Sequence, residues 1–240
     1  MATPLYRDHG IVLRTYKLGE SDRIVSFVTE QHGKVRAVAK GVRKTKSKFG
    51  ARLEPTSHVA LQLYEGRELH IVTQAETVDH FRALRDDLDR LTRAVTMLEA
   101  VDNLSMEGEP NPRLYRMLLG ALRALAAQDS PLVVAAFFWK LLALEGFEPR
   151  VDACAVCEST VDLVAFDLEE GGVLCRTDRR GTALTPEALD LLRRILGGQL
   201  GAALNEATSA ATVELDHLAV RAMEHHLERR LRSVGLLDRG

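Results

Sequence analysis

The sequence predicts an α+β protein with more than one domain: a five-stranded β-barrel at residues 1–79, then an all-helical domain at residues 80–240. Two observations predict this division. Apolar residues alternate with a period of two up to about residue 79, and from residue 80 they recur with a period near 3.6. A third observation adds a zinc-ribbon-like hairpin, inserted into the helical part at about residues 150–182, because cysteines with metal-ligand spacing lie there.

Five strand-like segments make up the predicted barrel. They alternate apolar and polar residues or are rich in β-branched residues, and they cover residues 11–16, 24–29, 34–40, 59–64 and 69–74. Glycine-containing turns separate them, and no helical period intervenes. Five short strands in about 70 residues favour an OB-type barrel, whose strand face and loops bind oligonucleotides. An SH3-like barrel is the alternative.

The most unusual stretch of the chain is basic and runs from residue 34 to residue 52. It holds eight cationic side chains and no acid: Lys34, Arg36, Lys40, Arg43, Lys44, Lys46, Lys48 and Arg52. Its first part reads as a strand with an apolar face and a largely cationic face, and its second part, between Gly41 and Gly50, reads as a loop. Such a surface suits a phosphate backbone. The plainer interpretation is a lysine-rich edge that discourages aggregation, although one or two lysines would serve that purpose.

From residue 80 the pattern predicts helices. One apolar stripe marks a long first helix through Leu84, Leu88, Leu91, Val95, Leu98 and Val101. Asn111 is the expected N-cap of a second helix, and residues 133–139 are apolar on every side and predict a buried third helix. Helices are also expected from Thr185 to Gly197 and from about residue 212, the last with a basic outer side at Arg221, Arg229, Arg230 and Arg232.

The hairpin carries a candidate metal site. Cys154 and Cys157 form one C-x-x-C pair, and after 17 intervening residues Cys175 and Asp178 repeat the spacing with aspartate in the fourth place. This is the spacing of a structural zinc site with three thiolates and one carboxylate. A structural role is favoured over a catalytic one, because four protein ligands close the coordination sphere of the metal. The alternatives are three buried thiols, or a redox pair formed by Cys154 and Cys157.

Charge and composition restrict the function further. Residues 1–79 hold 13 basic and 9 acidic side chains, whereas residues 80–240 hold 19 and 25. No signal peptide or membrane span is apparent, and three cysteines without secretory context indicate a reducing cytoplasm. Walker, dinucleotide-binding and H-E-x-x-H motifs are absent from the sequence, so a non-enzymatic protein is expected. A metal-dependent nuclease using Asp86, Asp87 and Asp89 and an RNA-binding OB protein are the alternatives.

Several stretches in order resemble the bacterial recombination mediator family RecO. The resemblance covers essentially the whole chain and rests on Gly10-Ile-Val-Leu-Arg14, Gly19-Glu-Ser-Asp22, Thr29 before Gly33, the basic run from Lys40 to Lys48, and Gly146-Phe-Glu-Pro149 leading into the cysteine pair. It implies an OB domain, a helical domain with a zinc-binding segment, and a cytoplasmic, nucleoid-associated role in homologous recombination. Where many relatives have a fourth cysteine, this chain has Asp178.

The resemblance also implies partners. Family members bind single- and double-stranded DNA and anneal complementary strands without being enzymes. They associate with RecR and with single-stranded-DNA-binding protein, and they help to load RecA. The expected DNA-binding residues of this chain are the eight cations of residues 34–52, and the expected metal is one structural zinc ion.

Overall fold

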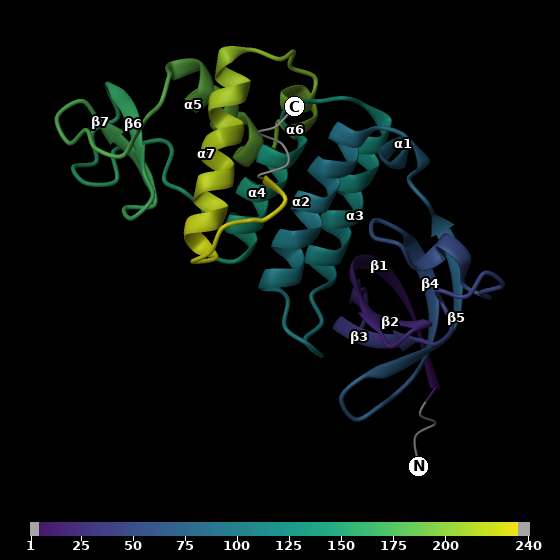
Figure 1. Cartoon of the computed structure of the whole chain (residues 1–240). Coiled ribbons are helices and arrows are strands. Elements are labelled where there is room, and N and C mark those ends of the chain that lie inside the picture. Colours follow the sequence, from purple (N-terminus) through teal and green to yellow (C-terminus); the bar gives the residue numbers. More distant parts are fainter. Residues whose placement is uncertain (1–4, 235–240) are drawn as a thin grey trace. The chain divides into compact units, whose positions relative to one another are not determined.

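The computed structural model describes residues 5–234 and shows a β-barrel, a set of helices and a small β-hairpin (Figure 1). The described chain forms two compact units. The first contains the residues up to Ala127 together with those from Leu231 onward, and the second contains Gln128–Arg230. The barrel ends at residue 79, where a domain boundary was expected. The next three helices, however, belong to the same compact unit as the barrel. No helix among the described residues has both the length and the apolar character needed to cross a bilayer.

The first unit confirms the five predicted strands. They are β1 (Leu5–Leu18), β2 (Asp22–Thr29), β3 (Gly33–Ala39), β4 (His58–Tyr64) and β5 (His70–Asp79). They close into a barrel in the order β1-β2-β3-β5-β4, with β3 and β5 parallel and the other pairs antiparallel. A closed five-stranded barrel of this order fits the OB type.

The barrel is filled from its strands and from one loop. On β3, Val35, Ala37 and Ala39 are at most 3% exposed, as their alternation with polar residues predicts. The segment between β3 and β4 contains a short 3-10 helix, η1 (Gly50–Leu53), and it contributes the fully buried side chains of Phe49 and Leu53 to the same core. The basic loop is therefore anchored in the barrel at its C-terminal end.

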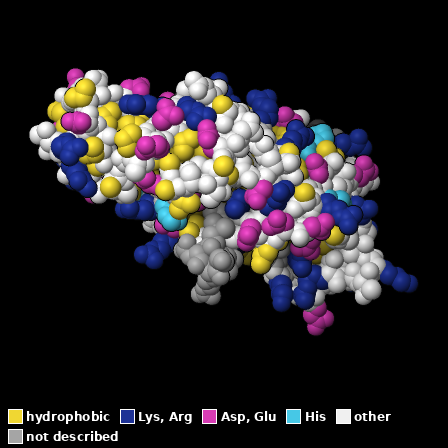
Figure 2. Space-filling view, turned by 90° about the horizontal axis from the view of Figure 1, so that it is seen from above, with side chains coloured by type: hydrophobic (Ala, Val, Ile, Leu, Met, Phe, Trp, Pro, Cys, Tyr) yellow, Lys and Arg dark blue, Asp and Glu magenta, His cyan; other side chains and the backbone are white. Residues whose placement is uncertain are grey.

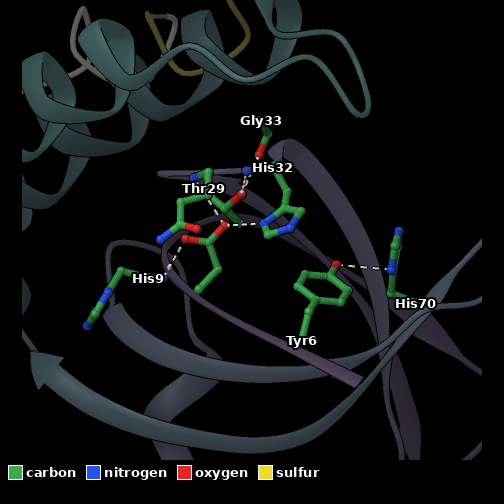
Figure 3. A network of polar contacts seen from close by, with 8 residues as sticks. Tyr6, His9, Thr29, His32, Gly33 and His70 are labelled. Carbon is green, nitrogen blue, oxygen red and sulfur yellow. Dashed lines mark hydrogen bonds and ion pairs between the residues drawn. The ribbon is translucent and has the colours of Figure 1, made fainter. Parts of the chain in front are cut away.

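A polar network fixes the turn between β2 and β3 (Figure 3). The buried carboxylate of Asp8 accepts a hydrogen bond from the backbone amide of Gln31 at 3.1 Å and lies 2.6 Å from Nδ1 of His32. The Thr29 hydroxyl donates to the carbonyl of Gly33 at 2.9 Å. These contacts satisfy the polar groups of a tight turn, so the start of β3 is held in a defined position.

Three helices extend the barrel unit: α1 (Arg82–Arg85), α2 (Leu88–Leu104) and α3 (Pro112–Ala127). The prediction of one continuous helix from residue 80 is wrong, because Asp87 caps α2 by accepting hydrogen bonds from the amides of Asp89 and Arg90. Leu88 is the first residue of α2 and is 78% exposed, whereas Leu98 of the same helix is buried. The N-cap predicted at Asn111 is confirmed by its hydrogen bond to the amide of Leu114.

The loop between α2 and α3 pairs with the first residues of β3. Glu107 forms β-bridges to Gly33 and Lys34, and the amide of Gly108 donates to the carbonyl of Lys34 at 3.1 Å. A Cβ atom at Gly33 would lie 2.0 Å from the carbonyl oxygen of Glu109, and its φ of +66° also favours glycine. The first residues of β3 do not pair with β5, and this loop pairs with them instead.

The second unit contains the remaining helices and the hairpin. Its helices are α4 (Val133–Leu144), α5 (Pro186–Leu196), α6 (Leu200–Leu204) and α7 (Ala210–His226), and its strands are β6 (Leu163–Asp167), β7 (Gly172–Cys175) and β8 (Thr182–Ala183). The apolar helix α4 is buried as predicted, with Phe137, Phe138 and Trp139 at most 3% exposed. The ring of Trp139 packs on Phe166 of the hairpin, with centroids 5.5 Å apart.

The end of α7 differs from the prediction. The helix stops at His226, and Glu228 adopts a left-handed conformation with φ of 52°. Arg229, Arg230 and Arg232 therefore follow the helix and do not line its outer side.

Candidate nucleic-acid interface and metal centre

The basic loop is held against the turn between β1 and β2. The amide of Gly41 donates to the Asp22 carboxylate at 2.7 Å, and the amide of Arg43 donates to the carbonyl of Ser21 at 3.0 Å. The hydrogen bond from Gly41, a second from Ser21 and the nearby charges of Lys40 and Lys44 hold the pKa of Asp22 below its usual value. Asp22 therefore fixes the loop in place as a carboxylate.

Six of the eight predicted cations lie on or beside this loop, and all six are exposed: Lys40, Arg43, Lys44, Lys46, Lys48 and Arg52. Three of them donate to uncharged backbone carbonyls, namely those of Glu20, Thr73 and Lys48. Such contacts position the side chains without neutralising their charge. The side chains of the other three, Lys40, Lys44 and Lys46, make no hydrogen bond or ion pair within residues 5–234.

The two cations on β3 are placed differently. Lys34 forms an ion pair of 2.9 Å with Asp102 near the end of α2, and both side chains are largely buried. Arg36 lies 3.3 Å from Glu107 in the following loop. These two acids, 68 and 71 residues further along the chain, were not found by sequence reasoning. The structure thus separates the eight predicted residues into six outward cations and two that already have carboxylate partners.

The predicted metal ligands converge in the second unit. One ligand atom from each of Cys154, Cys157, Cys175 and Asp178 lies within 4.8 Å of all the others. The Cys157 and Cys175 sulfurs are 3.6 Å apart, and an Asp178 carboxylate oxygen lies 3.4 Å from the Cys154 sulfur and 3.3 Å from the Cys175 sulfur. All three cysteines are free thiols.

Local backbone structure brings these side chains together. The hairpin places Cys175 at the end of β7, and the amide of Ala155 donates to the carbonyl of Val173 at 2.8 Å, which fixes the first cysteine turn beside that strand. Within this turn the amide of Cys154 donates to the carbonyl of Ser159 at 2.8 Å. The two turns thus bring their ligand atoms together, as the paired spacing predicts.

The residues fit a tetrahedral zinc ion. With Zn–S bonds of about 2.3 Å, neighbouring sulfurs of a tetrahedral site are separated by ~3.8 Å, and a sulfur and an oxygen by ~3.5 Å. The observed separations of 3.6, 3.4 and 3.3 Å are close to these values. Within the described residues this is the one group of three or more potential ligands brought so close together.

The thiols and the carboxylate of this cluster shift one another's pKa values. The neighbouring carboxylate of Asp178 raises the pKa of Cys157 to about 12, whereas hydrogen bonds from the three thiols, that of Cys157 first, lower the pKa of Asp178. Burial acts to raise the pKa of Cys154. Hydrogen bonds from backbone amides, the largest from Cys157, outweigh burial, so the pKa of Cys154 is lowered. Four anionic ligands at these distances repel one another, and a divalent cation removes this repulsion.

The acidic cluster that suggested a nuclease has structural partners. Asp86 pairs with Arg82 at 3.2 Å, and Asp87 caps α2 and pairs with Arg90 at 3.6 Å. On the face drawn in Figure 2, acidic and basic side chains are interspersed. Ion pairs of this kind are ordinary on a protein surface.

Together, the barrel, the helices and the thiol-bearing hairpin define a β-barrel protein with a helical extension. Residues 1–81 match the family model described as Recombination protein O N terminal, and residues 85–234 match Recombination protein O C terminal. The chain is 44% identical over 244 residues to a protein of a Nocardioides species named DNA repair protein RecO, covering 98% of this chain and 100% of that relative. The chain belongs to the RecO family of DNA repair and recombination proteins.

Proposed function

We propose that this chain is a recombination mediator that binds single- and double-stranded DNA, anneals complementary strands and has no catalytic activity. It assists RecA loading together with RecR and associates with single-stranded-DNA-binding protein, in the cytoplasm and at the nucleoid. Membership of the RecO family supports this role. The DNA-binding residues are the eight cations between Lys34 and Arg52.

The outward cations of the basic loop carry the proposal. The loop that carries them is held at Gly41 by Asp22 and at its other end by the buried Phe49. The charges therefore extend from a defined stretch of backbone. Each phosphate that a cation neutralises releases condensed counterions, which makes the affinity depend steeply on salt. Lys34 and Arg36 join the interface by exchanging Asp102 and Glu107 for phosphates.

Charge reversal tests this interface. Changing Lys40, Arg43, Lys44 and Lys46 to Glu removes four phosphate contacts and reduces the slope of log affinity against log salt by about 3, since each contact accounts for about 0.7–0.9. Binding to single strands and duplexes falls together. A variant with four exposed arginines of α1 and α3 changed to Glu has the same net charge and retains most of its affinity: Arg82, Arg113, Arg116 and Arg123. Normal binding by the loop variant would remove the site from the barrel.

Annealing needs a second cationic surface, because two strands that repel one another must be held together. Arg229, Arg230 and Arg232 are exposed and follow α7, and they are proposed as part of this surface. Changing them to Gln reduces annealing of complementary oligonucleotides more than it reduces binding of one strand. A proportional loss of both activities, or of neither, excludes a separate surface at these residues.

Cys154, Cys157, Cys175 and Asp178 are proposed to hold one structural zinc ion. Their separations and donor types support this. Zinc would stabilise the hairpin and complete its packing against α4. Elemental analysis after dialysis is expected to give one equivalent for the wild type and for Asp178→Cys, and much less for Asp178→Ala. Far less than one equivalent in the wild type would indicate packed thiols.

A non-catalytic role can be tested separately from DNA binding. Incubation of the chain with magnesium and end-labelled DNA is expected to leave the DNA intact, while complementary strands anneal without nucleotide. Cleavage that depends on Asp86 and Asp87 would instead identify a nuclease. Stronger binding of an RNA strand than of the matched DNA strand would indicate an RNA-binding protein.

A further inference from the structure

The three cysteines of the hairpin differ in their access to solvent. Cys157 is exposed, whereas Cys154 is fully buried and Cys175 is 4% exposed. A small oxidant in solution therefore reaches the Cys157 sulfur before it reaches the other two, and exposure is one of the properties that make a cysteine prone to oxidation. The chain contains no other cysteine, so oxidation at this site can be followed by counting thiols.

The exposed sulfur has a close thiol partner in the other turn. The Cys157 sulfur lies 3.6 Å from the Cys175 sulfur. A disulfide bond brings two sulfurs to about 2.05 Å, so a side-chain movement of about 1.5 Å would join this pair. Such a bond would connect the first cysteine turn to the end of β7.

Backbone hydrogen bonds hold the two turns together independently of any ligand. The segment before Cys157 runs beside β7, where the amide of Val173 donates to the carbonyl of Arg150 at 2.9 Å. The amide of Ala155 donates in turn to the carbonyl of Val173 at 2.8 Å. Cys157 and Cys175 are therefore kept near each other by the fold of the hairpin itself.

We propose that Cys157 and Cys175 form a reversible disulfide when the chain meets hydrogen peroxide, and that zinc is released as the bond forms. This rests on the proposed metal site and extends it from a fixed support of the hairpin to a redox-sensitive one. Disulfides of cytoplasmic proteins are usually transient and redox-sensing, because the compartment returns them to thiols. A pair with one exposed sulfur fits that behaviour.

The reaction consumes one peroxide and two thiolates. The Cys157 thiolate attacks a peroxide oxygen, the O–O bond breaks, and Cys157 becomes a sulfenic acid while a hydroxide leaves. The Cys175 thiolate then attacks the Cys157 sulfur, the S–S bond forms, and a second hydroxide leaves. Two protons from solvent convert both hydroxides to water. The two sulfurs lose two electrons, and the peroxide accepts them.

The disulfide removes two of the four ligands of the metal. Cys154 and Asp178 remain, and two protein ligands do not complete the four-coordinate geometry of a structural zinc site. The new bond meanwhile connects the two turns that the metal had connected. The hairpin therefore stays closed after the metal has left, so that reduction can restore the site.

Asp178 limits the reaction to one disulfide. A site with four thiols could form two disulfides, whereas here Cys154 is the one thiol left over, and it is fully buried. The Asp178 carboxylate oxygen lies 3.4 Å from the Cys154 sulfur, but a carboxylate cannot form a disulfide with it. Oxidation therefore ends in a defined state with a single protected thiol.

The test treats the zinc-loaded full chain with a small excess of hydrogen peroxide. The wild type is expected to lose two of its three thiols and the mass of two hydrogen atoms. Peptide mapping without reduction should join Cys157 to Cys175 and leave Cys154 free to be alkylated after denaturation. Bound zinc should fall about tenfold in parallel, because two of its four ligands are consumed. Excess reduced glutathione with added zinc should restore both the thiols and the metal.

Two variants test how the cluster limits its own oxidation. Asp178→Cys keeps zinc and supplies a thiol partner for Cys154, so peroxide in excess is expected to consume all four of its thiols and form two disulfides. Ala155→Ser alters the same turn without adding a thiol, and it is expected to behave as the wild type does. Asp178→Cys stopping at one disulfide would show that the aspartate does not set this limit.

Other outcomes overturn the proposal. A disulfide between Cys154 and Cys157, or oxygen added to Cys157 with no loss of a second thiol, would exclude Cys175 as the partner and leave the structural zinc site in place. Disulfide formation with zinc retained would overturn the release of metal. Reduced wild type without zinc would overturn the metal site and the release together. None of these results alters the DNA-binding proposal, which reversal of the basic loop tests.

Discussion

The basic loop and the cysteine hairpin arrange their side chains in opposite ways. The loop is fixed by its backbone and by Phe49, and its six cations are exposed. The hairpin directs four side chains to one point, where their ligand atoms lie within 4.8 Å of one another. Charges that act on a polyanion contribute separately, whereas ligands of one ion act as a set. The loop should therefore lose function gradually and the hairpin all at once.

The largest effect is expected for Cys154→Ser, which removes one member of the set. Apparent binding free energies of structural zinc reach about 10–16 kcal/mol in small peptides, so loss of the metal should unfold the hairpin. Bound metal should fall from one equivalent to nearly none, and the melting temperature should decrease, while DNA binding at low temperature persists. Ala155→Ser in the same turn is the control. Metal retention by Cys154→Ser would show that the ligands do not act as a set.

Phe49→Ala should have the next largest effect, because it tests how the loop is held. Removing this buried ring should destabilise the barrel by about 3–5 kcal/mol in urea unfolding. DNA affinity should also fall although no charge changes. Phe49→Leu refills most of the space and should recover much of both losses. A cost below about 1 kcal/mol would mean that the ring does not anchor the loop.

Asp102→Asn tests the cations that already have partners. The change leaves Lys34 without its carboxylate and should cost about 1–3 kcal/mol of stability. It should also raise the affinity for DNA, because Lys34 no longer has to give up a carboxylate partner before it contacts a phosphate. Glu107→Gln, beside the more exposed Arg36, should act in the same direction and more weakly. An unchanged affinity for DNA would place Lys34 outside the interface.

The smallest effect is expected for a single outward cation. Lys44→Ala should lower the salt slope by about 0.7–0.9 and change stability by less than about 0.5 kcal/mol. Arg113→Ala on α3 is the control and should leave the slope unchanged. Complete loss of binding by Lys44→Ala alone would contradict separate contributions, and the loop would then resemble the hairpin.

Much of the fold could be predicted because each barrel strand has one face in a core. Val35, Ala37 and Ala39 show this period directly in the sequence. Helix boundaries were less predictable. The single long helix expected from residue 80 was wrong because Asp87 accepts hydrogen bonds from two amides and starts a new helix. Helix α6 was missed because Leu200–Leu204 is too short to show a helical period.

The two sites differed in how much the sequence revealed. Metal ligands must be close in space, and short spacers such as those between Cys154 and Cys157 and between Cys175 and Asp178 supply part of that closeness within the chain itself. The number of cations in residues 34–52 was equally plain, but their surroundings were not. Asp102 and Glu107 lie far away in sequence, and their pairing with Lys34 and Arg36 depends on how α2 and its loop pack on the barrel.

The pairing of the α2–α3 loop with β3 has a practical consequence for dissecting the protein. A polypeptide cut after residue 79 would keep all five strands but would lose Glu107, which pairs with Gly33 and Lys34, and Tyr115, whose hydroxyl lies 2.7 Å from Nε2 of the buried His58. An unpaired strand edge is a template for joining another chain. The isolated barrel is therefore expected to self-associate, and an N-terminal fragment that keeps both contacts must include α3, which ends at Ala127.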